Sequence, residues 1–183
     1  MYIIEDVLND IQYKELSDIV MGVNFPWHYN PSSYLNDPIE SVGRMVDYPQ
    51  FIHKVFDSGE IRSNVFSYIL PIIRRIEHTK LLRVKLNLNV QDLEMKDDSY
   101  SVPHIDLHEE NCVTAVYYVN ESDGDTYLFN EPFGTPFEEL TIKKRITPKK
   151  NSLVVFPSDT MHSGNTPRTC KRRVVININV ITK

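Results

Sequence analysis

The sequence predicts an α+β protein, mainly β, in which helices come first and a jelly-roll-like β core follows. Two observations lead to this fold class. Apolar residues recur at helical spacing before about residue 80, and their period changes to two after it. The later β-rich segments are short and have no helices between them, which is typical of antiparallel sandwiches and barrels rather than of parallel βαβ units.

Length and composition are those of an ordinary globular protein. The chain of 183 residues is most simply a single domain, with 1–80 as helical and loop support and 81–183 as the jelly-roll core. The longest apolar stretch, 68–73, is far below the ~20 residues of a transmembrane helix. The N-terminus is acidic where a secretory signal would be basic, and Cys112 and Cys170 form no disulfide framework. We therefore expect a cytoplasmic protein with no membrane span.

The charge distribution argues against nucleic acid as a partner. The net charge is −5, so nothing in the overall balance attracts the protein to a phosphate backbone. Basic residues cluster locally at 143–150 and 171–173, where they can hold an anion or simply be solvated at strand ends.

Two helices are expected in the first 80 residues. Asn9 and Asp10 can cap a helix that runs to about residue 20. A second helix is predicted over 63–77, where Pro71 should introduce a kink. The residues expected to face a core are Ile11, Leu16, Ile19, Val20, Val65, Ile69, Ile72, Ile73 and Ile76. The segment between the helices, 24–50, should be loop apart from a short strand at 25–29.

Strands are predicted throughout the second half of the chain. Residues 83–90 alternate strictly between polar and apolar side chains, as a half-buried strand does. Further β-rich segments lie at 113–119, 126–129, 153–156 and 173–181. Turn signals such as Asp123-Gly124-Asp125 separate them.

Candidate metal ligands stand among the six histidines. His104 and Asp106 are two residues apart, so on a strand both would project from one face toward a single cation. The run His108-Glu109-Glu110 is a rival, and each histidine alone is more typical of a structural residue. His162, which follows an apolar strand, could supply a third ligand. Two imidazoles and one carboxylate form the facial triad associated with non-haem Fe(II).

An arginine accompanies this set on the last predicted strand. Arg173, Val175 and Asn177 share one face there, beginning eleven residues after His162. A guanidinium beside a metal can make a bidentate contact to a carboxylate and so orient a dicarboxylic ligand. Arg172 points the other way, although a shift of one residue in register would exchange the two arginines.

These residues together resemble the Fe(II)- and 2-oxoglutarate-dependent dioxygenases, specifically the prolyl 4-hydroxylase-like branch. The shared pattern is His104-x-Asp106, a distal His162 and an arginine about ten residues later. The strand 113–120, Val-Thr-Ala-Val-Tyr-Tyr-Val-Asn, is similar to the Thr-x-x-Tyr-Tyr-Leu-Asn strand of prolyl hydroxylases, and 123–126 resembles the Gly-Gly-x-Thr-like turn after it. The resemblance covers about residues 80–181 and implies a double-stranded β-helix, or jelly roll.

The resemblance also implies roles for individual residues. His104, Asp106 and His162 would be the catalytic metal ligands that hold Fe(II), with 2-oxoglutarate as cosubstrate and O2 as oxidant. Arg173 and Tyr118 would bind the distal carboxylate of 2-oxoglutarate. The cosubstrate-binding set is expected to comprise Arg173, Tyr118, Thr114 and Asn177, while Tyr117 should pack outward from the cavity.

Two departures from the branch concern the substrate. The Gly-Gly turn reads Gly124-Asp125, and the strand 85–89 lacks the tyrosine that prolyl hydroxylases commonly carry. Asn87 and Lys85 on that strand can contact cosubstrate or substrate, or be solvated. The loops at 28–50, 91–102 and 130–138 are expected to surround the barrel mouth.

The expected activity is hydroxylation of an unactivated C–H bond in a peptidyl or free amino-acid side chain, with proline as one candidate. The chain lacks the Arg-x-Asn-x-x-x-x-x-Arg pattern of nucleobase demethylases, which again argues against a nucleic-acid substrate. One alternative is a cupin-like enzyme with more histidines at the metal. Another is a catalytically silent β-sandwich binding module whose histidines are structural.

Overall fold

The structure is a computed structural model that describes residues 1–34, 39–96 and 98–183, and this part of the chain forms two antiparallel sheets and two α-helices. The elements in chain order are β1 (Tyr2–Ile4), α1 (Asp10–Val20), β2 (His28–Asn30), β3 (Gln50–Asp57), β4 (Glu60–Ile61), α2 (Phe66–Ile73), β5 (Lys80–Val90), β6 (Cys112–Tyr118), β7 (Thr126–Phe129), the 3-10 helix η1 (Phe137–Glu139), β8 (Ile142–Ile146), β9 (Ser152–Pro157), β10 (His162–Gly164) and β11 (Arg172–Ile181).

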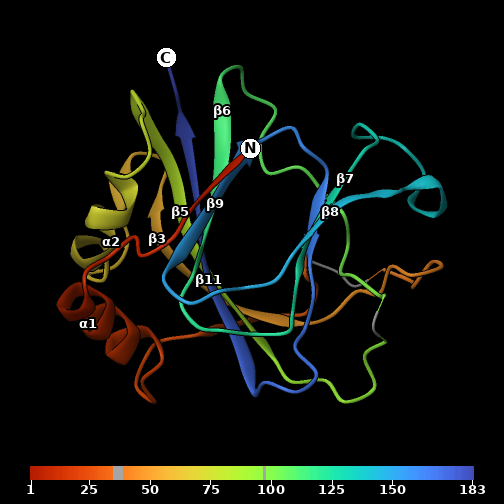
Figure 1. Cartoon of the computed structure of the whole chain (residues 1–183), viewed down its shortest axis with the longest axis horizontal. Helices are drawn as coiled ribbons and strands as arrows, with labels where there is room; N and C mark the ends of the chain where they lie inside the picture. The colour runs from red at the N-terminus through yellow and green to blue at the C-terminus, as the bar shows by residue number, and fades with distance from the viewer. Residues whose placement is uncertain (35–38, 97) are drawn as a thin grey trace.

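The two sheets have the layered arrangement of a jelly roll. The larger sheet has the order β1-β9-β6-β11-β5-β3-β2, with β4 paired to β3, and the smaller one has the order β10-β7-β8. Both helices lie on one side of the larger sheet, and the smaller sheet lies on the other (Figure 1). The mainly β fold predicted from the sequence is therefore confirmed. Within the described residues, no helix combines the length and apolar character required to cross a membrane.

Helix α1 begins where the sequence predicts it and has a narrower apolar face than expected. The Asn9 side chain accepts a hydrogen bond from the Gln12 backbone N–H, while the Gln12 side chain accepts one from Asn9 N–H, which completes a capping box. Leu16 and Val20 are buried, but Ile11 is 72% exposed, so its predicted place in the core is wrong. At about 100° per residue, Ile11 lies on the side of the helix opposite Val20.

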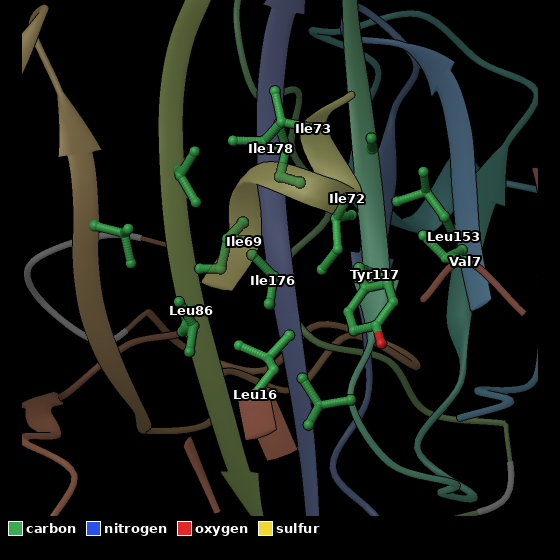
Figure 2. Packing of buried hydrophobic residues seen from close by; sticks show 14 of the residues in the cluster. Val7, Leu16, Ile69, Ile72, Ile73, Leu86, Tyr117, Leu153, Ile176 and Ile178 are labelled. Carbon is green, nitrogen blue, oxygen red and sulfur yellow. The ribbon is translucent and has the colours of Figure 1, made fainter. Parts of the chain in front are cut away.

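Helix α2 is shorter than the predicted 63–77 and includes Pro71. Its predicted stripe is correct, since Val65, Ile69, Ile72, Ile73 and Ile76 are all buried. Ile69, Ile72 and Ile73 pack with Leu16 against apolar side chains of the larger sheet, among them Leu86, Tyr117, Ile176 and Ile178 (Figure 2). This packing gives the larger sheet its buried outer face.

The inner face of the larger sheet carries the polar groups. On β11, Ile176 and Ile178 belong to the core under the helices, while Arg173, Val175 and Asn177 point to the opposite face. On β6, Tyr117 packs under the helices, as predicted, and donates a hydrogen bond to Asn151 Oδ1 (2.9 Å). The strict alternation of these strands thus separates an apolar layer from a polar one.

The first 80 residues contribute more strand than the sequence suggested. β1, β3 and β4 were not anticipated, and β8 at 142–146 and β10 at 162–164 were also missed. The strand expected at 25–29 lies at β2, slightly later. β3 pairs with β5 through Phe51–Leu88 and Ile52–Asn87, and it extends the larger sheet beyond the predicted 81–183 core. The sequences of β3 and β8 lack the strict two-residue alternation that marks β5, so the local pattern does not identify them as strands.

We expect Leu16→Ala to lower the free energy of unfolding by about 2–5 kcal/mol, because it leaves a cavity between α1 and the sheet. Ile11→Ala, on the exposed side of the same helix, is the matched control and should change it by less than about 0.5 kcal/mol. Denaturant titration measures both values. Equal losses in the two variants would contradict the helix orientation described here.

Candidate active site

Three potential metal ligands converge between the sheets. One ligand atom from each of His104, Asp106 and His162 lies within 4.8 Å of the others, and His162 Nε2 is 3.7 Å from Asp106 Oδ2. His104 and His162 face each other in an isolated antiparallel bridge, with both backbone hydrogen bonds at 2.9 Å. Asp106 lies in a loop, so the expectation that His104 and Asp106 share a strand face is wrong. The chain turn after His104, rather than the period of a strand, aims the carboxylate.

The backbone holds both imidazoles in the same tautomer. His104 Nδ1 donates to the carbonyl of Val102 and His162 Nδ1 donates to that of Thr160, each at 2.9 Å. Because a carbonyl only accepts, each Nδ1 carries the proton and each Nε2 keeps its lone pair for a metal. Burial, reinforced by the nearby charge of His162, lowers the pKa of His104 to about 3, so that imidazole stays neutral.

Asp106 is the most densely bonded side chain of the site. Its side chain is only 4% exposed. Oδ1 accepts from Arg83 Nη2 (2.6 Å), and Oδ2 accepts from Thr114 Oγ1 (2.7 Å). Asn177 Nδ2 donates to both oxygens and Asn179 Nδ2 donates to Oδ2 (3.2 Å). Burial opposes ionisation, but His162, Arg83 and His104 outweigh it and hold the pKa of Asp106 well below its usual value.

Sequence reasoning missed two of these partners. Arg83 lies on β5 and Asn179 on β11, directly opposite each other in register, and Arg83 Nε donates to Asn179 Oδ1 (2.9 Å). Alternation along the strands places both residues on the cavity face, because Arg83 shares a face with Lys85 and Asn179 shares one with Asn177. Only the position of Asp106 in the fold shows that these two residues meet a carboxylate.

The triad opens into a cavity of about 150 Å³. The described residues that line it are Asn30, Ser33, Tyr34, Gln50, Arg83, Lys85, Asn87, Asn89, Ser101, His104, Ile105, Asp106, Val116, Thr126, His162, Ser163, Gly164, Arg173, Val175 and Asn177. The predicted mouth loops 28–50 and 91–102 contribute to this lining, whereas 130–138 does not. Tyr34 stacks on His104, with ring centroids 4.6 Å apart.

Arg173 lines the cavity and Arg172 does not. The Arg173 side chain is buried and donates from Nη2 to Thr126 Oγ1 (2.8 Å), while its Nε finds no partner among the described residues. Burial lowers the pKa of Arg173, against the opposing effects of Tyr118 and Asp125. Arg172 is exposed and donates to the carbonyl of Met21 on the outer side of the sheet. A buried guanidinium with a free N–H fits a carboxylate ligand.

Two glycines make room for this guanidinium. A Cβ at Gly164 would lie 3.3 Å from Arg173 Nη1, and one at Gly124 would lie 2.9 Å from Arg173 Cδ and 2.6 Å from the Asn165 carbonyl oxygen. The neighbouring Asp123 accepts hydrogen bonds from three consecutive backbone N–H groups at 168–170. The Gly124-Asp125 departure from a Gly-Gly turn therefore keeps the glycine that the arginine needs.

The four residues predicted to bind the cosubstrate fall into two groups. Tyr118 donates to Thr126 Oγ1 (2.8 Å) beneath the Arg173 guanidinium, which lies 5.9 Å from its ring centre. Thr114 and Asn177 instead contact Asp106. Asn177 lines the cavity, whereas Thr114 and Tyr118 are not among the residues that line it. Thr126, which the sequence reasoning did not single out, joins Tyr118 to Arg173.

The remaining histidines lie outside this group. His53 Nδ1 donates to the Pro26 carbonyl and His78 Nδ1 to the Ile76 carbonyl. His108, the rival ligand, is exposed, and its ring centre is 6.4 Å from that of Phe133. Among the described residues, the only metal-ligand cluster of three contains His104, Asp106 and His162.

Two imidazole Nε2 atoms and one carboxylate fit a divalent first-row metal, with three positions left open. Thr114→Val, which keeps the side-chain shape, removes one donor to Asp106 and should weaken Mn(II) binding about 10- to 100-fold. Thr79→Val, at an exposed position, is the control. Mn(II) titration followed by electron paramagnetic resonance measures both. Unchanged affinity in Thr114→Val would show that this hydrogen bond does not support the ligand.

Comparison with known structures supports the fold. The non-haem α-ketoglutarate-dependent epimerase SnoN of nogalamycin biosynthesis aligns with a TM-score of 0.65 at 11% identity, covering 98% of this chain and 77% of that one. A prolyl hydroxylase from Trichoplax adhaerens aligns at 0.58 and 19%, covering 98% and 82%. A prolyl-4-hydroxylase from Pseudomonas putida aligns at 0.57 and 14%, covering 100% and 92%.

Sequence comparison identifies the family. No curated protein matches the chain in sequence. The 2OG-Fe(II) oxygenase superfamily, however, matches residues 90–181, just over half of the chain, and that range contains the whole metal-ligand cluster together with Arg173. The chain therefore belongs to the 2OG-Fe(II) oxygenase superfamily, whose chemistry uses Fe(II), 2-oxoglutarate and O2.

Proposed function

We propose that this oxygenase hydroxylates an unactivated C–H bond in a peptidyl or free amino-acid side chain, in the manner of prolyl hydroxylases. The observation that carries the proposal is the convergence of His104, Asp106 and His162 on one cavity that also contains the buried Arg173. Prolyl hydroxylases among the structural neighbours, and the similarity of strand 113–120 to theirs, support the choice of reaction.

The residue roles belong to the same proposal. His104, Asp106 and His162 would hold Fe(II) through their Nε2 atoms and one carboxylate oxygen. Arg173 would bind the distal carboxylate of 2-oxoglutarate, with Thr126 and Tyr118 fixing the guanidinium from below. Arg83, Thr114, Asn177 and Asn179 would keep Asp106 ionised and oriented.

Fe(II) held by His104, Asp106 and His162 would supply the activation of O2, the oxidant for converting 2-oxoglutarate to succinate and CO2 and for hydroxylating the substrate. The protein supplies orientation and an enclosed site. The Nδ1 hydrogen bonds to backbone carbonyls fix the tautomer of both histidines, so that Nε2 is the nitrogen offered to a metal. Burial keeps His104 neutral, and the charges and donors around Asp106 keep its carboxylate ionised. These fixed protonation states keep the donor set competent across the physiological pH range.

The alternatives are less consistent with these side chains. A cupin-like site would use additional histidines, and the remaining histidines lie outside the cluster. In a silent binding module with structural histidines, a buried arginine with an unpaired Nε would only cost stability. The presence of this arginine beside three convergent metal ligands favours an enzyme that binds a dicarboxylate.

The metal assignment predicts a spectroscopic signal. Under anaerobic conditions, Fe(II) and 2-oxoglutarate added together to the apo protein should produce a visible charge-transfer band, and adding O2 should yield succinate. His162→Ala should lose both signals while its circular dichroism stays native, because one of three ligands is missing. His78→Ala, outside the cluster, should keep them. A full band in His162→Ala would remove His162 from the ligand set.

The cosubstrate assignment predicts a contrast between neighbouring arginines. Arg173→Ala should weaken 2-oxoglutarate binding to the Mn(II)-loaded protein about 10- to 100-fold, because it removes a charged contact to the distal carboxylate. Mn(II) affinity should be retained. Arg172→Ala is the matched control and should leave both constants unchanged, since this side chain is exposed. Isothermal titration calorimetry distinguishes the two, and the reverse pattern would contradict the assignment.

A further inference from the structure

Lys85 is a cation inside the cavity that the oxygenase chemistry described above does not use. It lies on β5 and lines the same space as the triad. It forms no hydrogen bond or ion pair with any residue in the described part of the chain. Burial, together with the charge of Arg83, lowers the pKa of Lys85 to about 8, so the ammonium lacks sufficient compensating negative charge.

A second lysine increases this excess of positive charge. Lys54 on β3 stands directly opposite Lys85 in the register of the larger sheet, so both side chains leave the sheet on the same face. Like charges in directly opposed positions of an antiparallel pair are destabilising. Lys54 is partly balanced by Asp57 at 3.4 Å and is 63% exposed, which leaves Lys85 as the inner, uncompensated member.

The other cations of the lining, Arg83 and Arg173, have a carboxylate partner either in the protein or in the proposed complex with 2-oxoglutarate. Arg83 contacts Asp106 at 2.6 Å. In the proposed function, Arg173 and Fe(II) face the two carboxylates of 2-oxoglutarate. Lys85 is therefore the cationic lining residue that still lacks an anion once metal and cosubstrate are in place. A partly buried charge in such a cavity costs stability unless a ligand pairs with it.

Two buried acceptors stand on the strands beside Lys85. Asn87 Oδ1 and Asn177 Oδ1 have no hydrogen-bond donor among the described residues. Asn87 is two residues along β5 from Lys85, and Asn177 is opposite Lys85 on β11, so all three side chains face the cavity. The Asn177 amide N–H groups are engaged by Asp106, which leaves its oxygen for a ligand. The cavity therefore offers one cation and two acceptors in close proximity.

We propose that this group recognises a free amino acid, whose α-carboxylate pairs with Lys85 and whose α-ammonium donates to the Asn87 and Asn177 oxygens. The inference rests on the proposed function and narrows its substrate class. A residue inside a peptide has converted both of these charges to neutral amides. It would therefore leave Lys85 in the cavity without a counter-ion.

The experiment compares charged and neutral versions of the same side chains. The twenty free L-amino acids and their N-acetyl amides are tested for stimulation of succinate release by the Fe(II)-loaded enzyme. At least one free amino acid should stimulate succinate release, and its N-acetyl amide should not. The binding constant of that amino acid is then measured by calorimetry on protein loaded with Mn(II) and 2-oxoglutarate, a readout independent of turnover.

Variants then test the role of Lys85 itself. Lys85→Gln should weaken binding of the amino acid about 10- to 100-fold without changing 2-oxoglutarate affinity. Lys85→Arg should recover part of the loss, and Lys54→Gln should produce a smaller loss. Lys80→Gln, an exposed lysine at the start of the same strand, is the matched control and should bind like wild type.

The outcomes separate this inference from the proposed function. Succinate release without any substrate would keep the oxygenase assignment. If free amino acids and their N-acetyl amides then stimulated it equally, or if neither stimulated it, the free-amino-acid assignment would be overturned. A loss of 2-oxoglutarate affinity in Lys85→Gln, with unchanged amino-acid binding, would assign Lys85 to the cosubstrate instead. No consumption of 2-oxoglutarate under any condition would remove both proposals.

Discussion

The burial of one ionised carboxylate, Asp106, is the constraint on which the rest of the site depends. A carboxylate taken out of water is stable only if donors replace its hydration. Here the donors come from β5, β6 and β11, three adjacent strands of the larger sheet. Any shift in the register of these strands would remove a donor. The charge that qualifies Asp106 as a metal ligand therefore also ties the site to the pairing of the sheet.

The larger sheet can supply these donors because one of its faces is apolar and the other is polar. Apolar residues of β11 and β6 pack under α1 and α2, and the alternate residues face the cavity. The adjacent tyrosines on β6 illustrate the division, since Tyr117 belongs to the core under the helices and Tyr118 supports Thr126 on the other side. The helices are therefore not accessory. They bury the outer face, which allows the inner face to carry polar groups.

Three cationic side chains lie along the cavity face of β5 and β11, each opposite an asparagine. Arg173 and Asn89 face each other at one end, Asn177 and Lys85 lie further along, and Asn179 and Arg83 follow. Arg83 has a carboxylate partner within the protein, whereas Arg173 and Lys85 have none among the described residues. An unpaired positive charge in a cavity costs stability, so its presence indicates that a ligand binds there. The proposed contact to 2-oxoglutarate accounts for the cation at Arg173, and the proposed amino-acid substrate accounts for Lys85.

Strong local patterns made much of this structure predictable. Both helices, strands β5, β6, β7, β9 and β11, and the separation of Arg173 from Arg172 follow from periodicity, because a two-residue alternation places a side chain on one face without knowledge of the partner strand. The strands β1, β3, β4, β8 and β10 were not predicted from these patterns. β1 pairs with β9, far along the chain, whereas β3, β4 and β8 pair with neighbouring strands but lack the strict alternation of β5. The exposure of Ile11 depends on how α1 is rotated against the sheet.

By itself, therefore, the sequence determined the chemical types of the site: two imidazoles, a carboxylate and an arginine at spacings that a jelly roll can bring together. Only the tertiary structure decided which atoms meet. It placed Asp106 in a loop rather than on a strand, gave it Arg83 and Asn179, and set Lys54 opposite Lys85. The physical reason is that spacing along a chain specifies the face of one element, whereas contacts between elements depend on register and packing across the whole sheet.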